Sequence, residues 1–286
     1  MVDISNKIPP STVAVFEAIH SAAQKEGIPV FVIGAAARDI LFRYAFGLPA
    51  HRATRDIDIA IRVEDWNEYY RLVGTLFSTG DFKPTEMKHR YTFKGLETID
   101  IIPFGAIAGE RQSIAWPPTE DTIMGVLGFE EAFRAAISVT LRREPRLDIL
   151  VSTPAGLAIM KLISWDESYP RRGKDGQDFY YVAENYIEAG NDERLYNEAS
   201  DLTEVESFDR AMAGARLLGR DMGRLAEGDV QQRIHEIFVR ESDPSGPLKF
   251  ISDIVGTDIT MQEKFDEIMA LLHSVRDGFS EGLKQL

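Results

Sequence analysis

Two aspartates separated by one residue are the side chains in this sequence best suited to chemistry. Asp56 and Asp58 lie in the run Thr54-Arg55-Asp56-Ile57-Asp58-Ile59-Ala60-Ile61, where apolar residues alternate with others at the period of a β-strand. Both carboxylates are therefore expected on one face of the strand. A buried pair of this kind needs a salt bridge, a pKa shift or a bound cation. An isolated Asp-x-Asp is more often the solvated edge of an amphipathic strand, so its neighbours in the chain matter.

A glycine turn before this pair and a third aspartate after it change the interpretation. Residues 29–33 form a short apolar strand followed at once by Gly34, where backbone N–H groups of a strand-to-helix turn could approach a phosphate. Alone, such a glycine is more typical of a plain tight turn. Asp100 lies in a later strand, the second arm of a hairpin expected across Lys94-Gly95. Carboxylates on adjacent strands form an oxygen-rich site that suits Mg²⁺ or Mn²⁺ rather than zinc, and such ions could hold a triphosphate for an in-line displacement.

Together these residues resemble the signature of the nucleotidyltransferase superfamily, which has the polymerase-beta-like fold. That signature is a hydrophobic residue with Gly-Gly or Gly-Ser, then an Asp-x-Asp strand, then an acidic residue on a later strand. Here it is matched by Ile33-Gly34-Ala35, Asp56-Ile57-Asp58-Ile59 and Asp100. The context of these residues looks most like the AbiEii-type subgroup, which includes toxins of abortive-infection and type IV toxin–antitoxin systems. Its later basic and acidic motif is matched in order by Lys161, Arg171 or Arg172, Lys174-Asp175 and Asp178.

The resemblance, which covers about residues 28–180, implies an enzyme that moves a nucleoside monophosphate from an NTP to an acceptor hydroxyl with Mg²⁺ or Mn²⁺. It implies that Asp56 and Asp58 hold the metals, while Asp100 completes the second metal site and helps to deprotonate the acceptor. It also implies that Gly34 and Ala35 cradle the triphosphate, while Lys161 with Arg171 or Arg172 steadies it. For Asp178 the motif assigns no distinct role, and an anchor for Lys161 or Lys174 is the plain structural interpretation.

Ala35 stands where the family usually has a second glycine or a serine. Alanine is small and keeps its N–H, so phosphate binding is compatible with it, although a hydroxyl contact is lost. Two functions therefore stay open: an active nucleotidyltransferase, and a non-catalytic nucleotide-binding or regulatory protein that retains the fold. Three retained carboxylates favour the enzyme, because a protein that only binds has no chemical need of them. The acceptor also stays open between a tRNA end, a protein and a small molecule such as an antibiotic, and the subgroup implies a cognate antitoxin.

The charge balance restricts the partners. The 286 residues carry a net charge of −14, which disfavours extensive passive coating of nucleic acid. Local basic groups could still hold a nucleotide or one end of a nucleic acid, or could simply pair with surface acids; they are Arg38, Arg43, Arg52 and Arg55, and Arg171, Arg172 and Lys174. The turn Arg142–Arg146 could supply a local contact to an RNA acceptor. There is no cysteine and no paired histidine motif for zinc. The sequence shows no signal segment and no long apolar run, so we expect no association with a membrane. We expect a cytoplasmic location.

The pattern of elements predicts an α/β (α+β) fold, in which a small mixed-sheet domain over residues 1–150 precedes a helical domain over residues 151–286. The second domain contributes Lys161 and the motif that follows it. Strands are predicted at 29–33, 54–61, 89–93, 97–102, 137–141 and 147–151, helices at 10–26, 35–46, 64–77, 155–165, 177–188, 204–224, 229–240, 246–254 and 261–284, and a long loop at 105–128.

Overall fold

A computed structural model describes residues 2–51, 56–204, 207–243, 245–256 and 263–285. The chain divides into two compact units, Met1–Thr153 and Pro154–Leu286, and each is described by itself. The first unit contains a mixed sheet with helices, and the described part of the second unit contains helices and no strand. This confirms the mixed α/β class with a mixed sheet that the sequence predicts.

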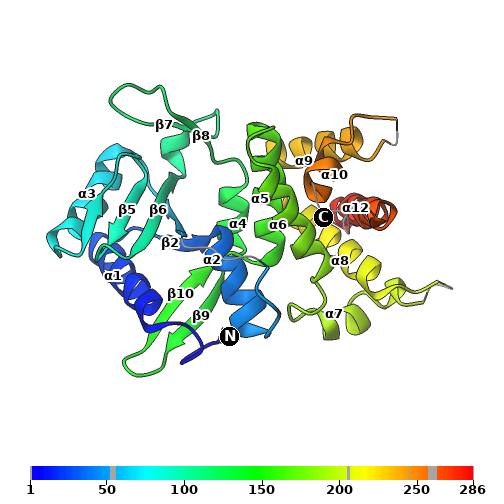
Figure 1. Ribbon diagram of the computed structural model, residues 1–286, viewed down its shortest axis with the longest axis horizontal. Helices are drawn as coiled ribbons and strands as arrows, with labels where there is room; N and C mark the ends of the chain where they lie inside the picture. The colour runs from blue at the N-terminus through cyan, green and yellow to red at the C-terminus, as the bar shows by residue number, and fades with distance from the viewer. Residues whose placement is uncertain (1, 52–55, 205–206, 244, 257–262, 286) are drawn as a thin grey trace. The chain divides into compact units, whose positions relative to one another are not determined.

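The first unit is built on an eight-stranded sheet with the order β1-β9-β10-β2-β3-β6-β5-β4 (Figure 1). Its central strands β3 and β6 run parallel, whereas β2–β3 and β5–β6 are antiparallel pairs. The predicted strands with apolar alternation are all present. The bounds are β1 Val2–Asp3, β2 Val30–Ile33, β3 Asp56–Arg62, β4 Phe82–Pro84, β5 Arg90–Phe93, β6 Glu97–Phe104, β9 Ile137–Arg142 and β10 Leu147–Val151.

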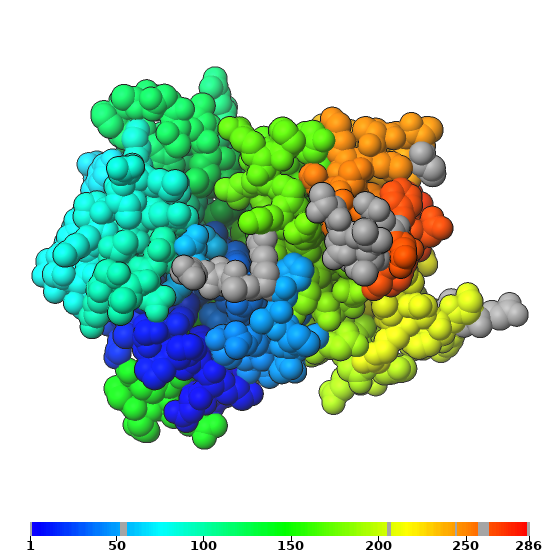
Figure 2. Space-filling view, in the orientation of Figure 1, coloured from blue at the N-terminus to red at the C-terminus, as the bar shows by residue number. Residues whose placement is uncertain are grey.

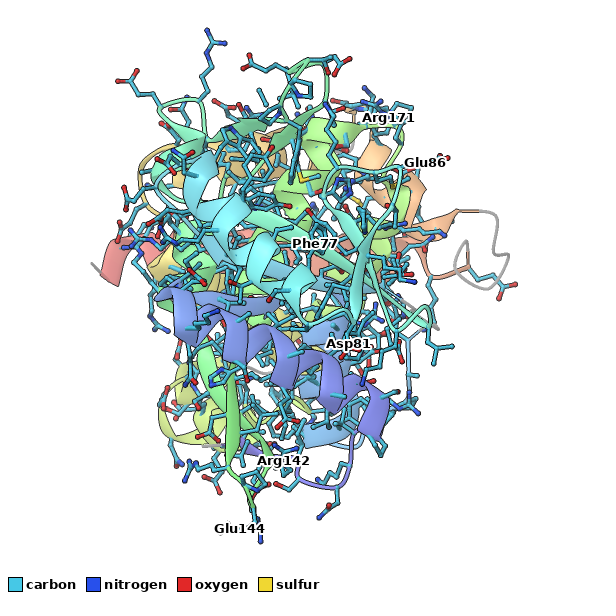
Figure 3. The ribbon with its side chains drawn as sticks, turned by 90° about the vertical axis from the view of Figure 1, so that its left-hand side faces the viewer. Phe77, Asp81, Glu86, Arg142, Glu144 and Arg171 are labelled. Carbon is cyan, nitrogen blue, oxygen red and sulfur yellow. The ribbon has the colours of Figure 1, made fainter. Side chains whose placement is uncertain are left out.

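Helices α1 (Pro10–Glu26) and α3 (Trp66–Ser78) lie side by side over one face of this sheet (Figure 3). Asp65 caps α3 by accepting from the backbone N–H groups of Asn67 and Glu68. The hydroxyl of Tyr69 lies 2.8 Å from that of Tyr91, and Phe77 packs its ring 5.6 Å from the same tyrosine. Tyr91 is in register with Ile99, and Ile99 with Ile57. The isoleucines of β3 therefore face these helices, and Asp56 and Asp58 face the opposite side.

The opposite face of the sheet is partly covered by α4 (Phe129–Arg134). The ring of Phe133 lies 5.4 Å from Phe31 and 5.6 Å from Phe104, both of which point to the same face as Asp58. These aromatic contacts lie further along the strands than the aspartates. The apolar part of this face is thus packed by α4, while the acidic part is next to the turn that leaves β2.

In the first unit, β1, β4 and α4 have no counterpart in the sequence prediction, and two further segments differ from it. The predicted helix over 35–46 is instead a short α2 (Gly34–Arg38) continued by a π-helical turn over Asp39–Ala45. The predicted loop over 105–128 contains a 3₁₀ turn at Ala106–Ala108 and a small hairpin of β7 (Ser113–Ala115) and β8 (Ile123–Gly125). Three-residue strands are too short to show a hydrophobic period. Trp116 holds this hairpin in place, since its ring is buried 5.1 Å from Trp66.

In the second unit, buried apolar stripes place the helices around a common core. Its elements are α5 Pro154–Ser168, α6 Gly173–Glu184, α7 Asp192–Asn197, a 3₁₀ turn Ser200–Leu202, α8 Arg210–Leu225, α9 Gly228–Glu241, α10 Lys249–Val255, α12 Phe265–Gly282 and a 3₁₀ turn Leu283–Gln285. Compared with the prediction, α6 begins four residues earlier, at Gly173, and α8 begins at Arg210.

Helices α8 and α12 approach so closely that their backbones touch. A Cβ atom added at Gly219 would lie 2.7 Å from the Phe279 nitrogen, and one added at Gly278 would lie 2.8 Å from the Arg216 carbonyl carbon. These glycines let the two helices pack without intervening side chains. Among the described helices of the chain, none is long and apolar enough to cross a membrane.

Candidate active site

Asp58 and Asp100 lie directly opposite one another on the parallel strands β3 and β6. Ile33 of β2 pairs with Asp58 on the other side, and Arg90 of β5 pairs with Asp100. Residues in one row across a sheet point to the same face, and Asp56, two residues before Asp58, shares that face. Strand pairing therefore brings together the three carboxylates that the sequence suggests and adds an arginine to them.

The turn after β2 lies directly on Asp58. Gly34 has φ +61°, and a Cβ atom at this position would lie 2.8 Å from Asp58 Cγ and closer still to Oδ2. Only glycine satisfies both the backbone conformation and the space. Ala35, the next residue, is buried with 8% of its surface exposed. The backbone that leaves the strand is thus in contact with the central carboxylate.

Arg90 forms a two-pronged ion pair with Asp100. Its Nε donates to Oδ1 over 2.7 Å and its Nη2 donates to Oδ2 over 2.8 Å, while Nη2 also lies 3.3 Å from Asp56 Oδ2. The hydrogen bonds to Asp100 raise the pKa of Arg90 above its ordinary value, and the charges of Asp100, Asp56 and Asp58 add to this against the effect of burial. The guanidinium is therefore a permanent positive charge across two of the three carboxylates.

The three carboxylates differ in their access to water. The Asp100 side chain is 11% exposed and Asp56 is 43% exposed, with Arg90 at 29%. His89 Nε2 lies 4.0 Å from Asp100 Oδ2, so the inner carboxylate has an imidazole beside it as well as the guanidinium. Asp100 is thus the enclosed end of the group, and Asp56 is its open end.

The donor chemistry fits a hard divalent ion, although the arrangement does not form a closed metal cage. Carboxylate oxygens are the ligands that Mg²⁺ and Mn²⁺ prefer. Within the described residues, no three or more Asp, Glu, His or Cys side chains are gathered closely enough to hold a metal ion as they stand. The cation that the carboxylates hold here is the guanidinium of Arg90. Asp100 and Asp56 are thus paired with a positively charged side chain of the same sheet.

The sequence pattern does not single out Arg90, although a signal for it exists. In the β5–β6 hairpin, Phe93 pairs with Glu97 across the turn Lys94-Gly95-Leu96, and counting outward from the turn places Arg90 opposite Asp100. Cross-strand neighbours have Cβ atoms about 4.5–5.5 Å apart. The arginine can be placed opposite Asp100 only with this three-residue turn, because the two-residue turn Lys94-Gly95 of the sequence prediction would place it opposite Ile99.

In the second unit, Lys161 of α5 is held between two aspartates of α6. Its Nζ lies 2.7 Å from Asp175 and 2.7 Å from Asp178, whose side chains are 8% and 2% exposed. Burial alone would lower the pKa of Lys161, but the two carboxylates outweigh it and raise the pKa. Arg172 adds a longer contact of 3.4 Å to Asp175. The motif predicted from the sequence thus forms a compact charged cluster, in which the positive charge of Lys161 is balanced by the carboxylates of Asp175 and Asp178.

The other basic residues named from the sequence lie in different settings. Arg38 is 2% exposed and donates to Asp39 over 2.8 Å. Arg171 and Lys174 lie at the surface of the second unit, with Arg171 labelled in Figure 3. Thr54, Arg52 and Arg55 lie outside the described residues.

The basic turn between β9 and β10 is matched by acids of the same unit. Arg142 forms an ion pair with Glu17 of α1, Arg143 with Asp3 and Arg146 with Asp148. Figure 3 shows Arg142 and Glu144 at this end of the unit, and in Figure 2 the green tip of the hairpin lies beside the blue N-terminal segment. The sequence suggests a local RNA contact for this turn, and in the structure these three arginines pair with acids of the same unit.

Comparison with known proteins gives likenesses in structure alone. No protein-family model and no curated protein matches the chain. The solution structure of the antibiotic-resistance factor ANT(2'')-Ia is 16% identical with a TM-score of 0.36, over 69% of this chain and 97% of that one. A CCA-adding enzyme in complex with ATP is 15% identical with a TM-score of 0.31, over 94% of this chain and 70% of that one. A Thermotoga maritima CCA-adding enzyme complexed with tRNA is 12% identical with a TM-score of 0.26, over 98% of this chain and 83% of that one. At identities and TM-scores this low, a likeness does not establish an activity.

Proposed function

We propose that the protein is a nucleotidyltransferase, which moves a nucleoside monophosphate from a nucleoside triphosphate to an acceptor hydroxyl. The observation that carries this proposal is the register of Asp58 with Asp100 on parallel strands, with the Gly34 turn in contact with Asp58. Carboxylates on two neighbouring strands beside a backbone turn can serve the phosphate and the acceptor at one place. Neither the solvated edge of a strand nor a plain tight turn requires this juxtaposition.

In this proposal the carboxylates hold Mg²⁺ or Mn²⁺ through Asp56, Asp58 and Asp100. A divalent ion bound there would neutralise the triphosphate and stabilise the leaving pyrophosphate. Asp100, the enclosed carboxylate, accepts the proton of the acceptor hydroxyl. The acceptor oxygen forms a bond to the α-phosphorus as the bond from that phosphorus to the bridging oxygen breaks, and pyrophosphate leaves with the electron pair.

The residues assigned to the triphosphate come from the sequence motifs. Gly34 and Ala35 are small and offer their backbone N–H groups to the triphosphate at the turn beside Asp58. Arg38, later in α2, is assigned to the same phosphate group. Lys161, with Arg171 or Arg172 and Lys174, is assigned to the triphosphate by the motif, and Asp178 is the anchor of Lys161. Because Asp175 and Asp178 neutralise Lys161, its substitution needs a test that separates binding from stability.

Two features favour a second function, the binding of a nucleotide without transfer. Arg90 already neutralises Asp100 and contacts Asp56, and Ala35 lacks the hydroxyl of the serine common in the family. A site kept only to bind would tolerate both features. In this second case the protein acts as a regulatory partner, for example within a toxin–antitoxin pair of the AbiEii type.

The deciding experiment measures label transfer. Purified protein is mixed with Mg²⁺ and each α-³²P-labelled NTP in turn, with tRNA, protein lysate or aminoglycosides as acceptors. The first and last of these follow the printed ligands of the similar structures, tRNA for one CCA-adding enzyme and adenylyl-2''-tobramycin for ANT(2'')-Ia. A cognate antitoxin is expected to suppress transfer if the protein is a toxin.

The matched variants are Asp58→Asn and Asp81→Asn. Asp81 is a half-exposed aspartate of the same unit, paired with Lys94 at 3.6 Å and remote in the chain from the carboxylate row. Transfer that is lost in Asp58→Asn and kept in Asp81→Asn supports the enzyme. Absence of transfer with every acceptor, together with nucleotide binding that is indifferent to Asp58→Asn, rules the enzyme out.

A further inference from the structure

The pairing of β5 with β6 determines the position of Arg90 next to Asp100. Arg90 stands in the same cross-strand row as Asp100 and Asp58, so its side chain must leave the sheet on the face of the three carboxylates. The turn over Lys94-Gly95-Leu96 fixes that register. This register therefore directs the guanidinium of Arg90 to Asp100.

The contacts of Arg90 use the oxygens that a metal ion would need. Both oxygens of Asp100 accept a hydrogen bond from it, at 2.7 and 2.8 Å, and one oxygen of Asp56 lies 3.3 Å from its Nη2. A guanidinium so placed offers charge neutralisation to two carboxylates that would otherwise repel each other. It also repels a divalent ion that approaches the same oxygens.

We propose that Arg90 is a built-in counter-ion of this carboxylate group, which a divalent cation must displace from Asp100 and Asp56 in order to bind. The inference rests on the proposed function, because it takes the carboxylates as the metal site of that reaction. It adds to that function a control of metal affinity. The protein keeps its acidic site neutralised and intact when no cation is present, at the cost of weaker binding when one is.

The alternative is that Arg90 forms a purely structural ion pair. The counter-ion role and the structural role predict different effects of removing Arg90 on the affinity for Mn²⁺. Removing a structural pair leaves Mn²⁺ binding unchanged or weakens it, because the site loosens. Removing a competitor strengthens Mn²⁺ binding. Arg90→Met keeps the length of the side chain and removes its charge, so it separates the two cases.

The experiment measures binding of Mn²⁺ alone by electron paramagnetic resonance to the full-length protein and its variants. Arg71→Met is the matched control, because Arg71 is an arginine of the same unit that also pairs with two carboxylates, Glu26 at 3.1 Å and Glu68 at 3.4 Å. It changes the net charge equally. Arg90→Met is expected to bind Mn²⁺ roughly tenfold or more tightly than wild type and Arg71→Met, and Arg90→Lys is expected to lie between them.

A measurement on wild-type protein covers the case in which Arg90→Met does not fold. The Nε–H signal of Arg90 is identified in ¹⁵N NMR spectra by its absence from Arg90→Lys, and Mg²⁺ is then added. The signal is expected to shift or exchange faster as the ion pair opens. An unchanged signal at saturating Mg²⁺, equal Mn²⁺ affinity in Arg90→Met and Arg71→Met, or no Mn²⁺ binding to any variant would overturn the proposal.

These outcomes are separate from those of the transfer assay. If Arg90→Met binds Mn²⁺ more tightly and no acceptor is labelled, the counter-ion role stands and the nucleotidyltransferase does not. If label transfer is lost in Asp58→Asn but Arg90→Met binds Mn²⁺ no more tightly than Arg71→Met, the nucleotidyltransferase function is supported and the counter-ion role of Arg90 is ruled out.

Discussion

Gly34 and Asp58 lie so close together that no side chain fits between them. The space that a Cβ atom of residue 34 would take is already occupied by the carboxylate of Asp58, 2.8 Å away at Cγ. The strand-to-helix turn and the central carboxylate are therefore a single structural unit, and a change to either disturbs the other.

Gly34→Ala should cost more stability than a positive φ alone explains. Gly27 offers the control, because it has φ +68° and nothing within 4 Å of an added Cβ. Gly27→Ala is expected to lower the free energy of unfolding by about 1 kcal/mol. For Gly34→Ala we expect a further loss of about 2 kcal/mol from the overlap, measured by urea denaturation. Asp58→Gly in the same chain should recover that further loss, and equal costs at the two glycines would contradict the close contact.

Lys161→Met should destabilise the second unit, because it removes the ammonium group that lies 2.7 Å from each of two buried aspartates. Loss of one partner of a buried pair costs about 3–5 kcal/mol. Lys264→Met, at an exposed lysine of the same unit, should change the unfolding free energy by less than about 0.5 kcal/mol.

The same residue can be tested for binding once stability is restored. Adding Asp178→Asn to Lys161→Met removes one of the two buried carboxylate charges and should recover part of the lost free energy. If Lys161 holds the triphosphate, label transfer stays low in this double variant. Transfer that returns together with stability would assign Lys161 a structural role only.

Gly278→Ala should weaken the contact between α8 and α12. Its methyl group would overlap the backbone of Arg216, which cannot move aside as a side chain can. We expect a loss of about 3 kcal/mol in unfolding free energy. In contrast, Gly74 in α3 has open space around it, and Gly74→Ala should stabilise the protein by up to about 1 kcal/mol through helix propensity. A mild effect at Gly278 would mean that the helices can separate at little cost.

Glu281 gives this helix pair a dependence on pH. Burial alone would raise its pKa, but hydrogen bonds from Arg216 and Arg220 outweigh that effect and hold the pKa below 4.5. A carboxyl whose pKa is lower in the folded state stabilises the fold above its unfolded pKa, and this contribution is lost as the pH falls through the folded pKa.

Accordingly, Glu281→Gln should cost about 1 kcal/mol at pH 7, since the side chain is partly screened by water, and the cost should shrink below about pH 4.5. Urea denaturation at several pH values from 7 to 3 measures this gap. Glu198→Gln, at a 61% exposed glutamate paired with Arg194, is the control, for which a small and flat difference is expected. A gap for Glu281→Gln that stays constant down to pH 3 would contradict the ion pairing.

Local signals in the sequence predict most of the sheet. Alternating isoleucines mark β3 and β6, and Lys94-Gly95 marks the hairpin between β5 and β6. The mixed α/β class follows from these strands and is confirmed. The three-residue strands β7 and β8 carry no such signal, because they are too short to show a period and the packing of Trp116 on Trp66 of α3 is a contact between distant residues.

Contacts between distant residues are where the sequence is least informative. That Arg90 lies opposite Asp100 depends on the hairpin register, and that Arg142 pairs with Glu17 depends on how α1 packs on the sheet. The sequence does not distinguish a basic residue that binds a ligand from one that forms an ion pair within the protein. The aspartates could be named because Gly34, Asp56-Ile57-Asp58 and Asp100 together match a motif, whereas their counter-ion is not part of that motif.

The three-residue turn between β5 and β6 has a consequence for how the site could change over evolution. Pairing in a hairpin has a period of two, so one residue inserted between Arg90 and the turn would move the arginine to the face covered by α1 and α3. The carboxylates on β3 and β6 would keep their own register, which β5 does not set. If Arg90 is the counter-ion proposed above, a single codon gained between Arg90 and this turn would thus change the cation affinity of the protein while every acidic residue of the site stays in place.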